Sequence, residues 1–135
     1  MQGDSALGRA LAVQQRAAAV GFDWPDASGP LAKVREEIAE LEREMRDAGS
    51  EMRDALAEEM GDLLFAMVNL ARKLAIDPAT ALEHANEKFV RRFEAVERLA
   101  AARGLVMGRA SLEQLDQLWE ETKATERRED GTTER

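Results

Sequence analysis

The chain has 135 residues and a mass of 15.0 kDa, which is enough for one domain with its own core and too little for two domains of ordinary size. It has no cysteine, which excludes disulfide bonds and thiol catalysis, and no apolar run long enough to span a bilayer or act as a secretory signal. The formal net charge of −8 leaves no global basic surface for a nucleic acid backbone, so we expect a cytoplasmic protein that binds neither nucleic acid nor membrane.

The composition predicts an all-α fold. Ala, Leu, Glu and Arg, which are strong helix formers, dominate the chain, and no stretch alternates polar and apolar residues as a strand would. Apolar periodicity and end signals predict helices over about 5–20, 30–48, 51–74, 78–103 and 111–125. We expect an antiparallel bundle of about five helices in one domain, residues 1–125, followed by a charged, disordered tail, residues 126–135.

Particular residues mark the ends of these helices. Gly21 and Gly104 follow the first and fourth helices at the position where a left-handed residue ends a helix. Pro30 suits the first position of the second helix, and Ser111 with Gln114 three residues later forms a capping box for the fifth. In the loop before Pro30, two aromatic residues are expected to anchor against the bundle, namely Phe22 and Trp24.

Four carboxylates stand at matched helical spacings beside apolar stripes. They are Glu37 and Glu40 in the second helix and Glu59 and Asp62 in the third. Each stripe alternates steps of three and four residues, which is typical of a heptad seam. The predicted seam consists of Leu31, Val34, Ile38, Leu41 and Met45 in the second helix and Leu56, Met60, Leu63, Met67, Leu70 and Leu74 in the third. If the two helices run antiparallel, the four acids converge on one side of the seam, where mutual repulsion would raise their pKa values unless a cation sits among them.

Oxygen ligands without Cys or a nearby His suit hard cations such as Mg²⁺ or Mn²⁺ rather than Zn²⁺ or Cu²⁺. A ferritin-like di-iron site would need Glu-x-x-His, but Ala81 stands three residues before the only histidine, so His84 is interpreted as a surface residue. By spacing alone, solvated acids such as Glu58 are more common than metal ligands. The pattern therefore leaves two interpretations open, a divalent metal site for phosphate-ester chemistry and an ordinary charged face.

The fourth and fifth helices carry further candidates. Asn86 falls on the apolar stripe of the fourth helix, where a buried amide needs hydrogen-bond partners or a functional role. Lys88 and Arg92 are four residues apart with no acid three or four positions away, so they could share a phosphate, although solvated charges are the more common explanation. Trp119 could stack on a nucleobase, but a lone Trp at helical spacing from leucines is more often part of the core.

Five segments share their pattern with one known family, and they are residues 21–25, 33–41, 58–65, 68–72 and 85–93. They include Glu36-Glu37-x-x-Glu40 followed, after a spacer, by Glu59-x-x-Asp62. From about Val20 to Lys123 the chain resembles the MazG family of all-α nucleoside triphosphate pyrophosphohydrolases. The acid spacing alone would be weak evidence, whereas its combination with the block at 85–93 is highly specific.

The resemblance implies an enzyme that hydrolyses a nucleoside triphosphate between the α and β phosphates with Mg²⁺, or with Mn²⁺ in its place. The products would be a nucleoside monophosphate and pyrophosphate, in a role of nucleotide-pool sanitation. Glu37, Glu40, Glu59 and Asp62 match the metal ligands of the family, and Glu36 would orient a ligand or the attacking water.

The same resemblance assigns substrate contacts. Lys33, Lys88 and Arg92 would contact phosphates, Trp119 would lie near the base, and Asn86, inside the matching block, is assigned to substrate binding as well. The family packs such helices into homodimers or homotetramers.

One departure from the family concerns domain number. Well-known members carry two such domains in tandem, whereas this chain has a single set of motifs, most like the second, and its sequence leaves open a stand-alone protein or an excised domain. The sequence pattern leaves the preferred base and sugar of the substrate open as well. Two alternatives of another class are a helical protein-interaction module with solvated acids and a nucleotide-binding regulator without catalysis.

Overall fold

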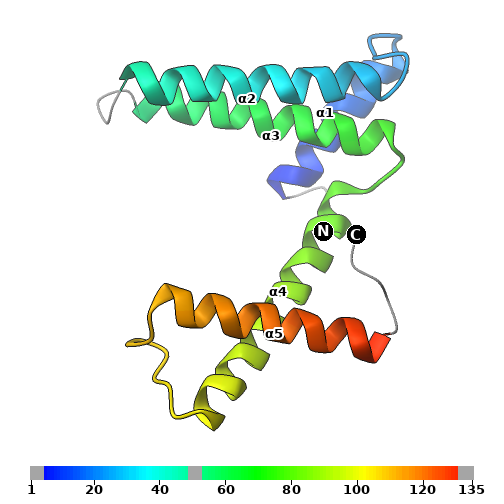
Figure 1. The fold of residues 1–135 in the computed structure, drawn as a ribbon. Coiled ribbons are helices and arrows are strands. Elements are labelled where there is room, and N and C mark those ends of the chain that lie inside the picture. Colours follow the sequence, from blue (N-terminus) through cyan, green and yellow to red (C-terminus); the bar gives the residue numbers. More distant parts are fainter. Residues whose placement is uncertain (1–4, 49–52, 131–135) are drawn as a thin grey trace. The chain divides into compact units, whose positions relative to one another are not determined.

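The computed structural model describes residues 5–48 and 53–130, and within those ranges it contains five helices and no strand (Figure 1). The helices are α1 (Ala6–Ala19), α2 (Ser28–Ala48), α3 (Arg53–Lys73), α4 (Pro78–Ala102) and α5 (Leu112–Asp130). The predicted all-α class is confirmed. The chain divides within α4 into two compact units, Met1–Leu82 and Glu83–Arg135, and each is described on its own.

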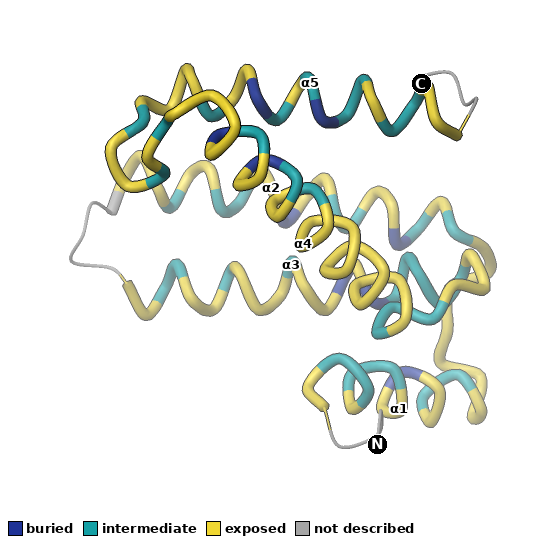
Figure 2. Tube along the Cα trace, turned by 90° about the horizontal axis from the view of Figure 1, so that it is seen from below, coloured by how far each residue is buried: buried dark blue, intermediate teal, exposed yellow. Residues whose placement is uncertain are grey.

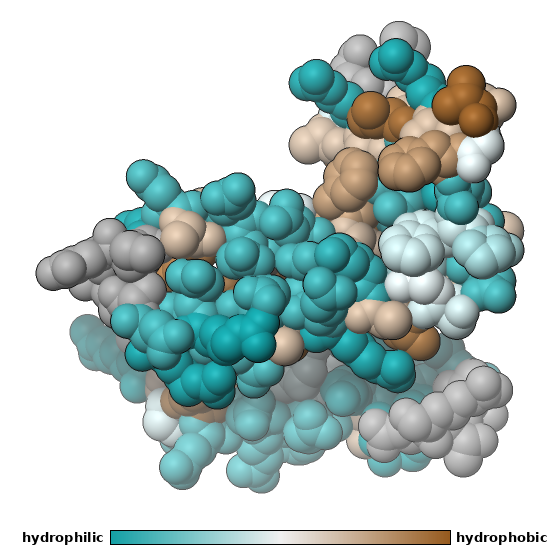
Figure 3. Space-filling view, turned by 90° about the horizontal axis from the view of Figure 1, so that it is seen from above, coloured by the Kyte–Doolittle hydropathy of each residue, from teal (hydrophilic) through white to brown (hydrophobic). Residues whose placement is uncertain are grey.

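In the first unit α2 and α3 form an antiparallel pair, as predicted, and α1 packs against α3 (Figure 1). Ala66 and Val68 of α3 are buried, but Ile38, Met60 and Met67 of the predicted seam are 43%, 44% and 49% exposed. The seam is only partly covered because a helix pair and one short helix leave part of each apolar stripe open. Hydrophilic side chains dominate the surface over α2, whereas hydrophobic ones gather over α1 (Figure 3).

The second unit is built around a small core where α5 meets the second half of α4. Val96, Ala100 and Leu118 are buried there, and Trp119 is one of the partly buried residues packed against them. The first half of α4 is exposed, as Figure 2 shows, and Asn86 is exposed with it. The prediction that Asn86 lies on a buried side was therefore wrong, because α5 covers only the later part of the α4 stripe.

Two glycines end helices as predicted. Gly21 (φ 90°) follows α1 and Gly104 (φ 74°) follows α4, both in the left-handed conformation. Ala75 (φ 60°) ends α3 in the same way, with the Ile76 N–H donating to the Ala71 carbonyl at 2.8 Å. An alanine was not expected at this position because its Cβ disfavours positive φ.

The second helix begins earlier than predicted. It begins at Ser28 rather than Pro30, because the Asp26 carboxylate accepts hydrogen bonds from the backbone N–H and the hydroxyl of Ser28. Pro30 still lies in the first turn, where a backbone N–H has no partner within the helix. At α5 the predicted capping box is confirmed, since the Ser111 N–H donates to Gln114 at 2.9 Å and the Gln114 N–H donates to Ser111 at 3.1 Å.

The fifth helix continues through half of the predicted tail. Residues 126–130 are helical, so the boundary after residue 125 was wrong, while residues 131–135 lie outside the described part of the chain. The charged side chains find partners on helices: Glu126 pairs with Arg92 at 2.7 Å, and Arg128 donates to the Thr125 hydroxyl at 3.3 Å. None of the described helices has both the length and the apolar character needed to cross a membrane.

The loop between α1 and α2 is held by Trp24 rather than by both aromatic residues. Phe22 is 81% exposed, so the prediction that it anchors the loop was wrong. Trp24 packs so closely over Gly29 that a Cβ at that position would overlap its indole ring. A glycine is needed here because of space rather than backbone conformation.

We expect Gly29→Ala to lower the free energy of unfolding by about 1–3 kcal/mol, because the added methyl group must push the indole away. Gly61→Ala, inside α3, is the matched control, since its Cβ would meet no neighbouring atom within 4 Å. That change should raise the free energy of unfolding by about 0.5–1 kcal/mol. Urea unfolding followed by circular dichroism measures both, and equal effects of the two substitutions would contradict the packing argument.

Candidate functional site

Three of the predicted acids converge between α2 and α3. Glu37, Glu59 and Asp62 each offer one carboxylate oxygen, and these oxygens lie within 4.8 Å of one another. We call these three residues the acidic cluster. Glu37 is only 6% exposed, whereas Asp62 lies at the surface. The antiparallel pairing of the helices therefore produces the convergence that the matched spacings predicted.

The charges in the cluster are incompletely balanced. Loss of solvation raises the pKa of the Glu59 carboxyl, and the negative charges of Glu37, Glu40 and Asp62 raise it further. The Lys33 ammonium lies 3.2 Å from Glu37 and 3.3 Å from Glu36, and its pKa is raised first by its hydrogen bond to Glu37. A single lysine does not neutralise several carboxylates, and such an oxygen-only donor set fits a hard divalent cation.

Glu40, the fourth predicted ligand, does not join the cluster. It forms an ion pair with Arg43 one turn further along α2, although its charge still contributes to the raised pKa of Glu59. Glu36 is exposed and donates no ligand atom to the cluster, but it accepts a hydrogen bond from Lys33. Arg43 stands three residues after Glu40, a spacing at which two helical side chains can pair. The spacing alone does not show whether Glu40 pairs with Arg43 or turns toward the cluster.

A cavity of about 330 Å³ opens beside the cluster, and we call it the acid cavity. Glu37, Asp62 and Lys33 line one part of it. Trp24, Phe65 and Asn69 are among the residues that line the rest. Charged ligand groups and an aromatic wall thus face the same hollow, which is the arrangement expected for a small ligand with a charged and an apolar part.

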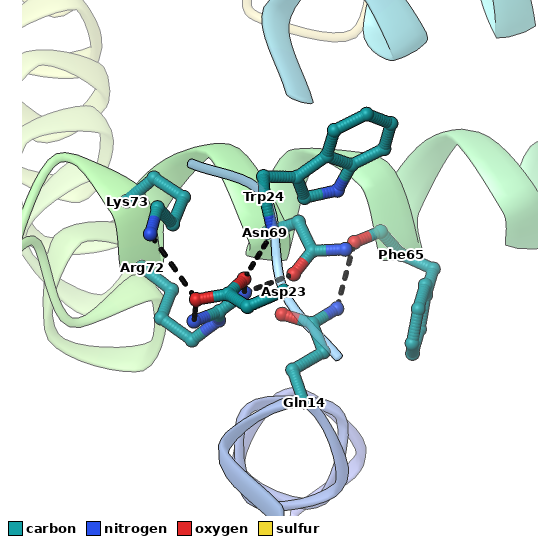
Figure 4. Close-up of polar contacts among 7 residues, drawn as sticks. All are labelled: Gln14, Asp23, Trp24, Phe65, Asn69, Arg72 and Lys73. Carbon is teal, nitrogen blue, oxygen red and sulfur yellow. Dashed lines mark hydrogen bonds and ion pairs between the residues drawn. The ribbon is translucent and has the colours of Figure 1, made fainter. Parts of the chain in front are cut away.

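Asp23 links the loop between α1 and α2 to α3 by ion pairs (Figure 4). The Arg72 guanidinium donates to both Asp23 carboxylate oxygens, at 2.5 and 3.1 Å, and Lys73 donates at 3.1 Å. These donors hold the pKa of Asp23 well below its usual range, the Arg72 hydrogen bonds contributing most. The stabilisation is therefore present above the unfolded-state pKa of about 4 and is lost only as the pH falls toward the folded-state value.

The sequence analysis assigned no role to Asp23 and Gln14, which hold the loop after α1 and α1 itself against α3. The Asp23 partners are some fifty residues away along the chain, so helical spacing could not reveal the ion pair. Gln14 is 5% exposed, and its side-chain amide donates to the Phe65 carbonyl at 3.0 Å (Figure 4). A signal for Gln14 existed, since it stands in steps of three and four from Leu11 and Ala18 on the apolar side of α1.

The predicted phosphate-binding pair lies in the second unit. Lys88 and Arg92 line a cavity of about 800 Å³ there. Within α4 no acid stands three or four positions from Arg92, as its sequence shows, but Arg92 pairs with Glu126 of α5 at 2.7 Å. Phosphate binding by the two residues stays a prediction.

Trp119 also belongs to the second unit and packs against its core. Its ring centroid lies 5.4 Å from that of Phe89, and the Arg92 guanidinium lies 5.8 Å from its ring. These contacts favour the core interpretation of Trp119 that the leucine spacing suggested.

Removing one charge from the acidic cluster should stabilise the protein in a chelator. Because the folded-state pKa of Glu59 is raised, its ionisation disfavours folding, and this cost grows as the pH rises above the unfolded-state value of about 4.3. We expect Glu59→Gln to raise the thermal midpoint at pH 7 in EDTA and to reduce the further rise on adding Mg²⁺.

The matched control is Glu58→Gln, since Glu58 is the exposed neighbour on α3. It should change neither quantity appreciably. Differential scanning fluorimetry measures both proteins, and a lower midpoint for Glu59→Gln in EDTA would show that the cluster is not a site of repulsion.

Comparison with known proteins supports the assignment of the chain to one family. Residues 28–97 match the MazG nucleotide pyrophosphohydrolase domain. A nucleoside triphosphate pyrophosphohydrolase of Escherichia coli is 50% identical over 121 residues, which cover 90% of this chain and 46% of that protein. The nucleoside triphosphate pyrophosphohydrolase/pyrophosphatase MazG of Thermotoga maritima is 45% identical over 118 residues, which cover 87% of this chain and 44% of that protein.

The chain spans about half the length of these curated relatives. The family match includes the acidic cluster, Lys33, Lys88 and Arg92, whereas Trp119 lies outside it. Since the match extends over more than half of the residues, this protein belongs to the MazG nucleotide pyrophosphohydrolase domain family.

Proposed function

We propose that this domain hydrolyses nucleoside triphosphates between the α and β phosphates, giving a nucleoside monophosphate and pyrophosphate, with Mg²⁺ or Mn²⁺ as cofactor. Family membership and the activity for which the relatives are named support the reaction class. The biological role would be the removal of unwanted nucleotides from the pool.

The acidic cluster is the observation that carries the proposal. Three carboxylates within 4.8 Å, one of them only 6% exposed, repel one another strongly, and Lys33 offsets only part of their charge. A bound divalent cation would remove the repulsion, and it would supply charge neutralisation of the phosphates and a lowered pKa for a bound water. All three members of the acidic cluster offer carboxylate oxygen, which favours Mg²⁺ or Mn²⁺ over softer metals.

The neighbouring residues complete the proposed site. Glu37, Glu59 and Asp62 would hold the cation, and Glu40, which pairs with Arg43 in this structure, would be the fourth ligand. Lys33 reaches the acid cavity from the same helix as Glu37 and binds a phosphate oxygen there. Glu36, exposed beside Lys33, orients a ligand or the attacking water.

The other residues that the family resemblance assigns to substrate binding belong to the second unit. Lys88 and Arg92 would bind phosphates, for which Arg92 must exchange Glu126 for a phosphate oxygen. Asn86 is exposed, which leaves its amide available for substrate. Trp119 would lie near the base by the family resemblance.

We also propose that the chain assembles as a homodimer or homotetramer. The exposed apolar residues of the first unit support this, since Met60, Leu64 and Met67 of α3 are 44%, 50% and 49% exposed. Surface apolar residues on this scale are typical of interaction surfaces. Static light scattering reports the mass, and a monomer at micromolar concentration would contradict the proposal.

A helical interaction module without catalysis is the second candidate. The exposed Phe89, Val90 and Phe93 of α4, 57%, 52% and 41% exposed, favour it. Such a module would show no metal-dependent triphosphate binding, whereas the proposed enzyme requires it.

We expect Asp62→Ala to lower the rate of Mg²⁺-dependent pyrophosphate release by more than about a hundredfold, because even residues that only orient metal ligands cost 10–100-fold when removed. Helicity should not change, since Asp62 is exposed. Glu58→Ala, which removes an exposed acid from the same helix, should retain the wild-type rate.

Both variants are assayed beside the wild type on ribo- and deoxynucleoside triphosphates, with Mg²⁺ and with EDTA. Retained activity in Asp62→Ala would remove the metal-site assignment. Release of orthophosphate instead of pyrophosphate would show that the bond cleaved is not the one between the α and β phosphates.

A further inference from the structure

Charged side chains of both signs share the cavity of about 800 Å³ in the second unit, and we call it the α4–α5 cavity. Its charged lining consists of basic residues of α4 and acidic residues of α5, namely Lys88, Arg91, Arg92 and Arg98, and Glu126, Glu129 and Asp130. Basic side chains suited to phosphate thus face carboxylates of the same chain. A phosphate ligand must compete with these carboxylates for the same cations.

Arg92 already holds one of these acids. Its Nε donates to a carboxylate oxygen of Glu126 at 2.7 Å, which is a charge-assisted hydrogen bond. The two side chains are only 22% and 33% exposed, so water screens this ion pair less than it screens a pair at the open surface. Of the basic residues that line the cavity, Arg92 is the one that pairs with an acid in the described part of the chain.

The packing of α5 directs Glu126 toward α4. Leu118, Thr122 and Glu126 stand four residues apart and therefore share one face of α5. Leu118 and Thr122 are 2% and 7% exposed, and Leu118 belongs to the core that α5 forms with α4. The Trp119 ring, whose centroid lies 5.8 Å from the Arg92 guanidinium, adds an attraction for the same cation. Arg92 and Glu126 are therefore held together before any ligand binds.

A carboxylate oxygen on Arg92 occupies the place that a phosphate oxygen would take. Both are anionic acceptors of charge-assisted hydrogen bonds from a guanidinium group. A phosphate ligand of Arg92 binds only to the fraction of molecules in which Glu126 has released the guanidinium, and its apparent affinity is reduced by that fraction. Because α5 keeps the carboxylate at a high effective concentration, Glu126 also reclaims Arg92 when the ligand leaves.

We propose that Glu126 is an internal competitor for Arg92, which lowers the affinity of the site for phosphate ligands and thereby favours the release of phosphate-bearing products. This inference rests on the proposed function, because it takes Arg92 as a phosphate contact. It adds a residue of α5 that sets the strength of that contact, and sequence analysis had placed this residue in the charged tail.

Glu126→Gln tests the competition, because it removes the negative charge and keeps the shape of the side chain. Isothermal titration calorimetry with Mg²⁺ measures the affinity for inorganic tripolyphosphate and for the α,β-methylene analogue of ATP. We expect both to bind the variant about fivefold more tightly than the wild type, with a matching fall in KM and no rise in kcat. A side chain that only supported the fold would not tighten binding when it is changed.

The matched control is Glu129→Gln. Glu129 belongs to the same helix and lines the same cavity, but it forms no ion pair with Arg92. This variant loses the same charge, so it reports how far the negative field of the cavity alone weakens binding. We expect its affinity gain to be clearly smaller than that of Glu126→Gln, and the thermal midpoint of each protein shows whether it folds.

A second measurement uses the wild-type protein and does not depend on the folding of Glu126→Gln. The arginine Nε–H signals are recorded by nuclear magnetic resonance, and the signal missing from Arg92→Lys identifies Arg92. Since the Arg92 Nε donates to Glu126, its signal should shift when Mg²⁺-tripolyphosphate displaces the carboxylate. A signal that does not change at saturating tripolyphosphate would overturn the inference.

The failures of this inference and of the proposed function are distinguishable. Weaker tripolyphosphate binding by a folded Glu126→Gln protein would show that Glu126 positions Arg92 for the ligand instead of competing with it. Equal gains in Glu126→Gln and Glu129→Gln would show a general effect of charge. Either result would overturn the inference and leave the proposed function intact, whereas a wild type without any Mg²⁺-dependent triphosphate binding would contradict both.

Discussion

Carboxylates of like charge face one another across the antiparallel pair of α2 and α3. Packing these helices buries Glu37 beside Glu59 and Asp62, and among the described residues Lys33 alone forms an ion pair with this cluster. Such repulsion opposes the packing that creates it, because carboxylates brought together lose solvation and repel one another. A cation bound at the acidic cluster would therefore stabilise the first unit. The proposed chemistry follows from the phosphate groups that such a cation can bind.

Other contacts in the first unit position the residues beside the acidic cluster. Asp23 ties the loop after α1 to Arg72 and Lys73, and Gln14 ties α1 to the Phe65 carbonyl. Together these contacts hold Trp24 in the wall of the acid cavity.

Local signals predicted the helices and the acidic cluster well. Period and caps located the five helices, and the antiparallel pairing of Glu37 with Glu59 and Asp62 followed from their side of the seam. Long-range contacts were not predictable in this way, because the Asp23–Arg72 and Arg92–Glu126 pairs join residues on different elements. Burial was also misjudged for Asn86, since a helix stripe shows which face is apolar but not whether anything covers it.

The most direct test of the metal site counts bound ions. Electron paramagnetic resonance of free Mn²⁺, titrated into the wild type and into Glu37→Gln, measures metal binding without reference to any reaction. Saturable binding in the wild type that is competed by Mg²⁺ and lost in the variant is the result predicted here. Equal Mn²⁺ binding by both proteins, or none by the wild type in the presence of a nucleoside triphosphate analogue, would contradict it.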